Sequence, residues 1–317
     1  MTKQTLRLVA DIGGTNARFA LAREDGTLRE PRSLGTRRFA SLTEAAQEYL
    51  RAIGARPRDA CIAVAGPVNG DVVRLTNHRW EFSIAATRDA LGLARLRVIN
   101  DFEAIALALP ALRADDLEQI GGGAPVPGRP MAVLGPGTGL GVAQLIATRE
   151  GFQPISTEGG HASIGPCEEA ELQILATLLR NGQQLSREAL LSGPGLERIY
   201  WALCLAGNIE YQGYAAAEIQ ARAVAGSDAT CRAALAHFCA FLGTAAGDQA
   251  LCCGAQGGVY IAGGIVPRFT GFLRQSLFRA RFEGKGPMRG YVSAIPVYVI
   301  TRENPGMLGA ARADLRS

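Results

Sequence analysis

The sequence predicts an α/β layer structure made of two similar halves. Short apolar runs alternate with amphipathic stretches along the 317 residues, and strands with interleaved helices indicate helices layered on a sheet. A strand, glycine turn, strand pattern opens the chain at residues 6–21 and returns at 131–143, which suggests an internal duplication. Because 48% of the residues are hydrophobic, each half can bury a core of its own.

The first hairpin carries the most informative motif. The runs 6–10 and 17–21 are predicted strands, and Asp11-Ile-Gly-Gly-Thr-Asn joins them. Glycine tolerates the positive φ that lets successive N–H groups converge, and such concavities bind anions. Asp11 would repel a bare phosphate, so the pattern points to a magnesium–nucleotide complex. A plain glycine hairpin is the alternative that Gly13-Gly14 alone leaves open.

Other phosphate-binding motifs are excluded. A dinucleotide fingerprint needs a helix after its glycine turn, whereas a strand follows here. A P-loop and a protein kinase both need a lysine at a fixed place. The chain has only two lysines, Lys3 and Lys285, and neither lies in such a motif.

The remaining elements of the first half follow in order. Ser41-Leu-Thr-Glu is a capping box that predicts a helix to about Ile53. Ser83 is predicted to cap a second helix, and the stripe after Asp101 predicts a third. Strands are predicted at 61–65, at about 72–76 and at 96–100.

The second half begins after the best linker candidate, Gly121–Gly128, with the returning hairpin. The stretch 168–253 is predicted to be mostly helical. It ends in a long apolar helix at 228–253, whose pattern favours core over a cofactor site. Strands at 259–262 and 297–301 and a short terminal helix after Asn304 complete the series.

Charge and composition limit the partners. The net charge is +4, and the densest basic cluster is Arg279, Arg281, Lys285 and Arg289, interrupted by Glu283. We expect this cluster to be a solvated surface, with a phosphate contact as the alternative. No aromatic residues interleave it, so nucleic acid is not an expected partner.

Cysteine usage and hydropathy predict a soluble cytoplasmic protein. The seven cysteines are odd in number and form no Cys-x-x-Cys, which favours free thiols in a reducing compartment. The start of the chain lacks a signal-peptide pattern, and no apolar run is long enough to cross a membrane.

Polar residues at predicted strand ends are the candidate catalytic groups. Asn100-Asp101 follows a buried strand and begins a helix, a position where ligands bind in open α/β sheets. Asp101 could accept a proton there, or could be an ordinary helix N-cap. Glu158-Gly-Gly-His161 can present two side chains to a polyhydroxyl ligand, although a lone histidine is more often structural. Glu188 is either a third such group or a first-turn helix residue.

Together these features resemble the bacterial glucokinase family, part of the actin-like ATPase superfamily with hexokinase and the Hsp70 chaperones. The resemblance covers nearly the whole chain, and the order and spacing of its segments are more specific than any single motif. The matching segments are Val9–Arg18, Gly66–Val68, Thr76–Trp80, Ile99–Phe102, Gly137–Gly141, Glu158–His161, Leu191–Leu196 and Ile261–Arg268.

The resemblance implies two ribonuclease H-like (actin-like ATPase) domains with a cleft between them. A small α/β domain would span 1–110, completed by 301–317, and a large α/β domain would span 111–300. It also implies phosphorylation of glucose at its 6-hydroxyl, with ATP and Mg²⁺, and a possible homodimer.

Residue roles follow from the same resemblance. Asp101 would be the catalytic base, and Asp11 would meet magnesium through water. The sugar would be bound by Asn100, Asp101, Glu158, His161 and Glu188. The nucleotide would be bound by Ala10, Asp11, Ile12, Gly13, Gly14, Thr15, Gly137, Thr138 and Gly139, with Gly263 and Gly264 against the adenosine.

Two features separate the chain from the related ROK sugar kinases and repressors. Those proteins carry a cysteine-rich zinc motif beside the sugar histidine, whereas only Cys167 follows His161 here. No DNA-binding segment precedes Asp11 either. One departure is Pro136 before the second glycine turn, which we expect the turn to tolerate.

Two alternatives to glucose phosphorylation stay open. The hydroxyl-binding residues would also suit another hexose or an acetamido sugar. The chain could instead be a nucleotide-gated binding module of the actin or Hsp70 kind, although Asn100-Asp101 with Glu158 and His161 argues against that.

Overall fold

The computed structural model describes residues 6–23, 25–76, 78–149 and 151–315. The chain divides into two compact units. The first comprises residues 1–112, 152–156 and 302–317, and the second comprises 113–151 and 157–301. The glycine-rich stretch Gly121–Gly128 therefore lies inside the second unit, between strands β8 and β9, and does not separate the units as a linker would.

A five-stranded mixed sheet forms the centre of the first unit. Its order is β3-β2-β1-β4-β7, in which β1 is antiparallel to β2 and parallel to β4, and β4 is parallel to β7. The strands are β1 (Arg7–Ile12), β2 (Asn16–Ala22), β3 (Leu28–Gly35), β4 (Asp59–Val64) and β7 (Arg95–Asn100), with β5 (Val72–Arg74) and β6 (Glu81–Ser83) as a separate ribbon.

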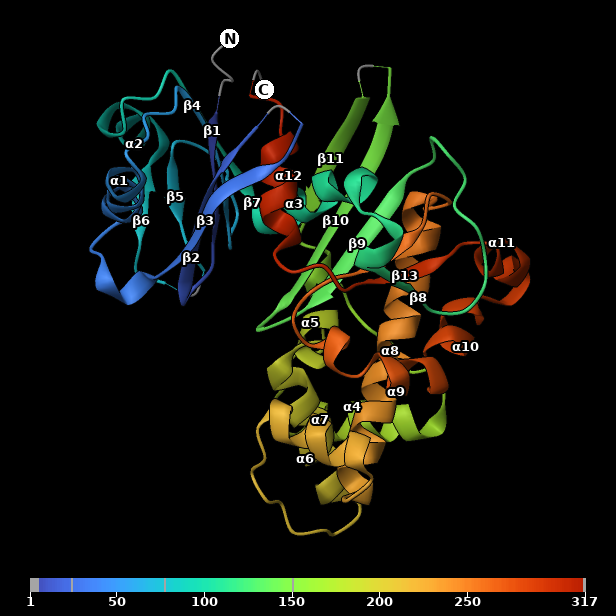
Figure 1. Cartoon of the computed structure of the whole chain (residues 1–317). Helices are drawn as coiled ribbons and strands as arrows, with labels where there is room; N and C mark the ends of the chain where they lie inside the picture. The colour runs from blue at the N-terminus through green and yellow to red at the C-terminus, as the bar shows by residue number, and fades with distance from the viewer. Residues whose placement is uncertain (1–5, 24, 77, 150, 316–317) are drawn as a thin grey trace. The chain divides into compact units, whose positions relative to one another are not determined.

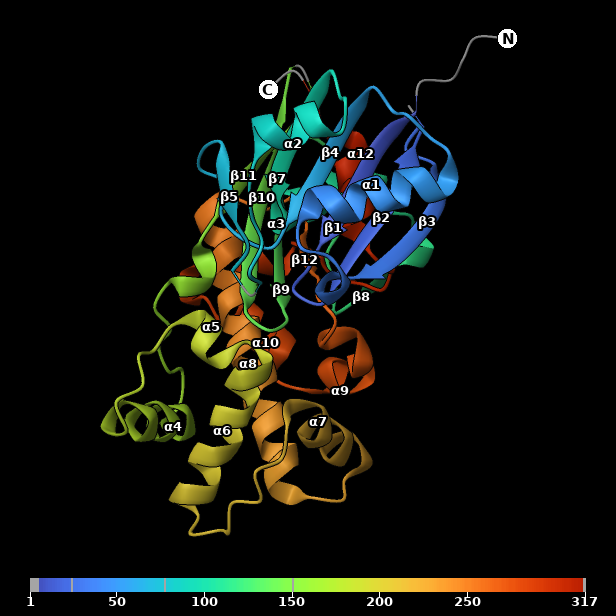
Figure 2. The ribbon, with the colours of Figure 1, turned by 90° about the vertical axis from the view of Figure 1, so that its left-hand side faces the viewer.

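Helices cover both faces of this sheet. α1 (Leu42–Ile53) packs on one face, and α3 (Asp101–Ala108) and α12 (Pro305–Arg312) lie together on the other (Figures 1 and 2). Ser41 caps α1 through the Glu44 N–H, and Ser83 caps α2 (Ile84–Ala90), as predicted. α12 brings the end of the chain beside β1 and α3.

The second sheet repeats the strand order of the first. Its order is β11-β10-β9-β12-β13-β8, with β9 antiparallel to β10 and parallel to β12, and β12 parallel to β13. Only the antiparallel edge strand β8 is added. This shared topology bears out the predicted repeat. The strands are β8 (Leu117–Gln119), β9 (Met131–Pro136), β10 (Leu140–Thr148), β11 (Gly151–Thr157), β12 (Val259–Ile261) and β13 (Val297–Ile300).

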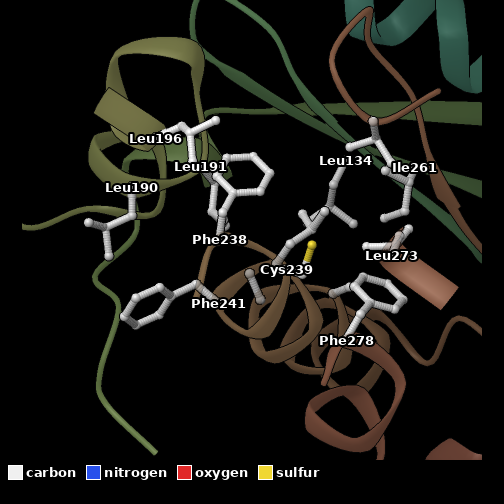
Figure 3. Close-up of a cluster of buried hydrophobic side chains, with 14 of the residues drawn as sticks. Leu134, Leu190, Leu191, Leu196, Phe238, Cys239, Phe241, Ile261, Leu273 and Phe278 are labelled. Atoms are coloured by element: carbon white, nitrogen blue, oxygen red, sulfur yellow. The ribbon is translucent and has the colours of Figure 1, made fainter. Parts of the chain in front are cut away.

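The long helix α8 (Ala229–Cys253) is the core of the second unit. Its predicted inner face, with Cys231, Leu235 and Cys239, is at most 1% exposed. Phe238 and Phe241 of α8 lie near Leu190, Leu191 and Leu196, while Leu134 and Ile261 come from the sheet (Figure 3).

The other α-helices of the second unit are α4 (Glu169–Arg180), α5 (Arg187–Leu190), α6 (Gly193–Ala206), α7 (Ala216–Ala225), α9 (Thr270–Gln275), α10 (Phe278–Glu283) and α11 (Arg289–Ser293). Short 3-10 helices occur at Thr36–Arg38, Leu109–Ala111, Ala114–Asp116, Gly159–His161, Val266–Arg268 and Gly286–Met288.

Three of the four cations in the basic cluster on and after α10 do not form the solvated surface that we predicted, whereas the fourth, Arg289, is exposed. The side chains of Arg279, Arg281 and Lys285 are only 14%, 17% and 9% exposed. Arg279 binds Glu283 and two backbone carbonyls, and Lys285 donates to Asp248 and to the carbonyl of Thr244. Arg281 also pairs with Glu168 and Glu171. Arg281 and Lys285 therefore join segments that are distant in the sequence, whereas Arg279 pairs with Glu283 within α10.

All seven cysteines are free, as predicted. Burial raises the pKa of the Cys61 and Cys239 thiols to about 12, so both are inert at neutral pH. Within the described ranges, no helix has both the length and the apolar character needed to span a membrane.

Candidate functional site

Thr36 holds the first glycine turn in place. Its N–H donates to the carbonyl of Thr15 at 3.0 Å, and its Oγ1 donates to the carbonyl of Gly14 at 2.9 Å. Among the described residues, the N–H groups of Gly14 and Thr15 have no acceptor, so they can bind an anion. Sequence analysis missed Thr36, because a lone threonine after a strand carries no signal.

The first glycine turn does not use the positive φ that we predicted for it, and the second glycine turn does not use it either. Gly13, Gly137 and Gly139 do not have positive φ in the described structure. A Cβ on Gly13 would meet only the carbonyl oxygen of Asn16, at 3.6 Å, so the turn is open on its outer side. The absence of a side chain is what allows a ligand to approach the backbone here.

Asp11 lies beside this turn with a largely buried side chain. Its Oδ2 accepts a hydrogen bond from Arg18 Nη1 at 3.4 Å, and the side chain is 20% exposed. Burial raises the pKa of Asp11, and the charge of Arg18 opposes that rise. Ala10 and Ile12 on either side are fully buried, so only their backbone atoms could serve a nucleotide.

Asn100, and not Asp101, is the N-cap of α3. Asn100 Oδ1 accepts from the N–H groups of Phe102 and Glu103 at 2.8 and 3.3 Å, and Nδ2 donates to the carbonyl of Gly66 at 3.1 Å. The predicted alternative role for Asp101, an ordinary N-cap, is therefore wrong. Asp101 is the first residue of the helix, and its Oδ1 contacts the N–H of Phe102 at 3.0 Å.

The Asn100 amide retains capacity for a ligand. Its nitrogen has a second hydrogen beyond the one given to Gly66.

The segment Thr76–Trp80 of the resemblance contains Asn77, which lies outside the described residues.

A polar cavity in the second unit gathers three of the predicted site residues. The cavity has a volume of about 340 Å³ and is lined by Thr138, His161 and Glu188. Glu158 is not one of its described lining residues. The rest of the lining is Gln183, Gln184, Ser186, Ala189, Ser192, Pro194 and Arg198, of which sequence analysis assigned none to the site.

The loop with Glu158 and His161 depends on Gly160. The Glu158 carbonyl accepts the His161 N–H at 3.0 Å, which closes a single 3-10 turn. A Cβ on Gly160 would lie 2.1 Å from the carbonyl oxygen of Leu140, so no other residue fits. Both Glu158 and His161 are exposed.

Glu188 contacts the second glycine turn directly. It lies on α5, whose N-cap Ser186 accepts from the Ala189 N–H. Its Oε2 accepts the Leu140 N–H at 2.8 Å, immediately after Gly139. The Gly137 N–H donates to the carbonyl of Gly139, and Gly193 at the start of α6 donates to the carbonyl of Gly137, both at 2.8 Å.

Gly263, which follows β12, packs against the end of β9, just before the second glycine turn. With φ of 87°, its Cβ would lie 2.3 Å from the carbonyl oxygen of Pro136. Gly264 has open space around it and is exposed. Pro136 is the last residue of β9, where the strand ends at the second glycine turn.

One other cluster, Glu168, Glu171 and His237, has the spacing of metal ligands within the described ranges. Arg281 Nη2 already bridges the two carboxylates, at 2.6 Å from Glu168 and 3.2 Å from Glu171. The guanidinium supplies the positive charge that a metal would bring.

Two sheets of one topology, each opening with a glycine-turn hairpin, define an α/β protein of the two-domain actin-like ATPase fold. A crystal structure of a glucokinase from an Antarctic psychrotroph is similar over 97% of this chain and 98% of that one, with a TM-score of 0.89 and 38% identity. A glucokinase from Balamuthia mandrillaris, solved with glucose, has a TM-score of 0.81 at 26% identity, over 99% and 94% of the two chains.

Sequence comparison then gives the family. The family model described as Glucokinase matches residues 8–316. The glucokinase of Chromobacterium violaceum is 50% identical over 306 residues, covering 96% of this chain and 88% of that protein. That of Yersinia pestis is 47% identical over 307 residues, covering 96% and 95%. The chain belongs to the glucokinase family.

Proposed function

We propose that this protein transfers the γ-phosphoryl group of ATP to the 6-hydroxyl of D-glucose, giving glucose 6-phosphate and ADP. The observation that carries the proposal is the cavity that Glu188 and His161 line together with Thr138 of the second glycine turn. The candidate sugar-binding side chains and the candidate nucleotide-binding turn thus line the same cavity, as a kinase for a small polyol requires. The family membership of the chain supports the same activity.

Asp101 would be the general base. Its position at the end of β7 and the start of α3 is where the positive end of a helix favours a carboxylate. It would take the proton of the attacking hydroxyl. Asn100 has the N-cap role, so α3 does not need the Asp101 carboxylate as its cap.

Glu158, His161 and Glu188 would bind the remaining hydroxyls, with Asn100 adding its second amide hydrogen. Fixed polar groups of this kind reject analogues that leave one of them unpaired. This favours glucose over sugars with a different hydroxyl arrangement.

The residues fit a magnesium–ATP complex. The first turn offers the N–H groups of Gly14 and Thr15, and Asp11 stands beside them as a hard oxygen ligand suited to hydrated Mg²⁺. Thr138 and Gly139 of the second turn, with Gly263 and Gly264, would receive the rest of the nucleotide. When bound, the metal would neutralise charge on the phosphate oxygens.

Phosphoryl transfer has a loose transition state, so these residues act mainly by positioning. The turns fix the phosphates, the cavity fixes the sugar, and Asp101 holds the proton that leaves the hydroxyl. We expect the reaction in the cytoplasm, where ATP is available. A homodimer stays a prediction that sedimentation analysis can check.

A coupled assay for sugar-dependent ADP release tests the proposal. We expect strong activity with glucose, weak or intermediate activity with mannose, and much lower kcat/KM with fructose and N-acetylglucosamine. Equal activity on fructose, or preference for the acetamido sugar, would contradict the choice of glucose but keep a sugar kinase. ATP binding without any sugar-dependent turnover would favour a nucleotide-gated binding module.

A further inference from the structure

Glu188 lines the cavity, and its carboxylate also contacts the second glycine turn (Gly137–Gly139). Oε2 accepts the Leu140 N–H at 2.8 Å, and a Cβ on Gly139 would lie only 2.4 Å from the same oxygen. The carboxylate therefore rests directly on the backbone of the turn. The side chain also lines the cavity beside His161.

The surrounding hydrogen bonds make this contact rigid. The backbone carbonyl of Glu188 accepts from Ser192 Oγ at 2.8 Å, and Ser192 in turn caps α6 by accepting the Gly195 N–H at 3.0 Å. Gly193, the first residue of α6, donates to the carbonyl of Gly137. The second glycine turn is thus bonded to α5 through the Glu188 carboxylate and to α6 through Gly193. The Glu188 carbonyl also bonds to Ser192, the N-cap of α6.

Leu140, which follows the second glycine turn, also lies beside the Glu158–His161 loop. Its carbonyl oxygen lies so close to Gly160 that no Cβ fits between them. Its N–H donates a hydrogen bond to Glu188 Oε2. The backbone of this one residue therefore contacts both the Gly159–His161 turn, through its carbonyl, and the Glu188 carboxylate, through its N–H.

We propose that Glu188 is a positioning residue for the ATP phosphates in addition to a sugar ligand. One carboxylate oxygen fixes residues 137–140 through the Leu140 N–H, while the side chain lines the cavity proposed to hold the sugar. The proposal rests on the proposed function for the identity of the two ligands, but the contact itself does not depend on which sugar binds.

Nucleotide binding without sugar isolates this role. Titration calorimetry with Mg²⁺ and the non-hydrolysable analogue AMPPNP should show weaker binding for Glu188→Ala by roughly three- to tenfold, the factor expected of one hydrogen bond. Glu188→Gln keeps an oxygen that can accept the Leu140 N–H, so it should retain AMPPNP affinity within about twofold. It should still lose glucose affinity, because the charge is gone.

His161→Ala is the matched control, because His161 lines the same cavity and no described hydrogen bond joins its side chain to the turn. It should weaken glucose binding and leave AMPPNP binding unchanged. Wild-type AMPPNP affinity in Glu188→Ala would overturn the proposal, as would equal loss in the alanine and glutamine variants.

Hydrogen exchange of the segment 137–141 gives a readout that needs no ligand. We expect faster exchange in Glu188→Ala than in wild type and in Glu188→Gln. If Glu188→Ala does not fold, Glu188→Asp, whose shorter side chain cannot keep the contact, takes its place, and unchanged exchange there refutes the proposal. A wild-type protein that binds AMPPNP but does not phosphorylate glucose would contradict the proposed function and leave this test intact.

Discussion

The carboxyl group of Asp11 lies against Gly306, although the two residues come from opposite ends of the chain. A Cβ on Gly306 would be 3.7 Å from Asp11 Cγ. Gly306 is in the first turn of α12, which begins at Pro305. Asn304 at the N-cap has a left-handed φ of 50°, and its side chain makes no capping hydrogen bond. The carboxylate thus faces the positive end of a helix, which favours its charge.

Asp11→Asn should make the protein more stable near neutral pH and less active. Burial raises the pKa of Asp11 in the folded state, with Arg18 opposing, so the ionised form is disfavoured by folding. Such a group lowers stability above its folded pKa, and this cost disappears below the unfolded value of roughly 3.9. Thermal unfolding should show a higher Tm for the variant at pH 7 and a gap that closes as the pH falls toward that value. A lower Tm at pH 7 would mean that Arg18 and α12 outweigh burial.

Asp101→Ala should depress kcat by ~10²–10⁴-fold, the usual effect of removing a general base. Glucose binding, followed by calorimetry, should remain measurable. Asn100→Ala provides the contrast, because it removes the N-cap of α3 and should cost about 1 kcal/mol of stability. Near-normal turnover in Asp101→Ala would refute the base assignment.

Gly160→Ala should raise the glucose KM strongly, because its Cβ would overlap the carbonyl oxygen of Leu140 and displace His161. Gly165→Ala, a few residues further on, is the control, since a Cβ there meets nothing within 4 Å. The pair should differ in glucose KM and in Tm. Similar kinetics in both variants would show that the loop adapts without effect on the sugar.

Thr36→Val should raise the ATP KM several-fold while glucose binding changes less. The substitution removes the hydroxyl that donates to the Gly14 carbonyl, at a fully buried position. A lost hydrogen bond of this kind costs roughly 1–3 kcal/mol. Thr43→Val, which breaks a hydroxyl pair with Thr87 elsewhere in the same unit, should lower stability without changing the ATP KM. An ATP KM that rises equally in both would remove the specific role of Thr36.

The sequence predicted most elements because their signals are local. Ser41 and Glu44 mark the start of α1, and Asn304-Pro-Gly marks the start of α12. The returning hairpin at 131–143 predicted two halves of one topology, which the two sheets confirm. Hydrophobic pattern, capping and turn chemistry act within a few residues, so one chain is sufficient to find them.

Contacts between distant segments decided the rest. Asn100, and not Asp101, is the N-cap of α3, and its side-chain amide also donates to the carbonyl of Gly66, which follows the neighbouring strand β4. Arg281 and Lys285 of the basic cluster form ion pairs that the sequence did not indicate, because their partners Glu168, Glu171 and Asp248 lie more than thirty residues away in the sequence.

The sequence by itself determined the two halves, their elements and the residue types of the candidate site. The tertiary structure alone decided which neighbours those residues contact: Glu188 accepts the Leu140 N–H, Thr36 donates to the Gly14 carbonyl, and Gly306 lies beside Asp11. The physical reason is that burial and hydrogen bonding depend on distance in space. Residue identity sets what a side chain can donate, accept or exclude, and only the packed fold sets which neighbour receives it.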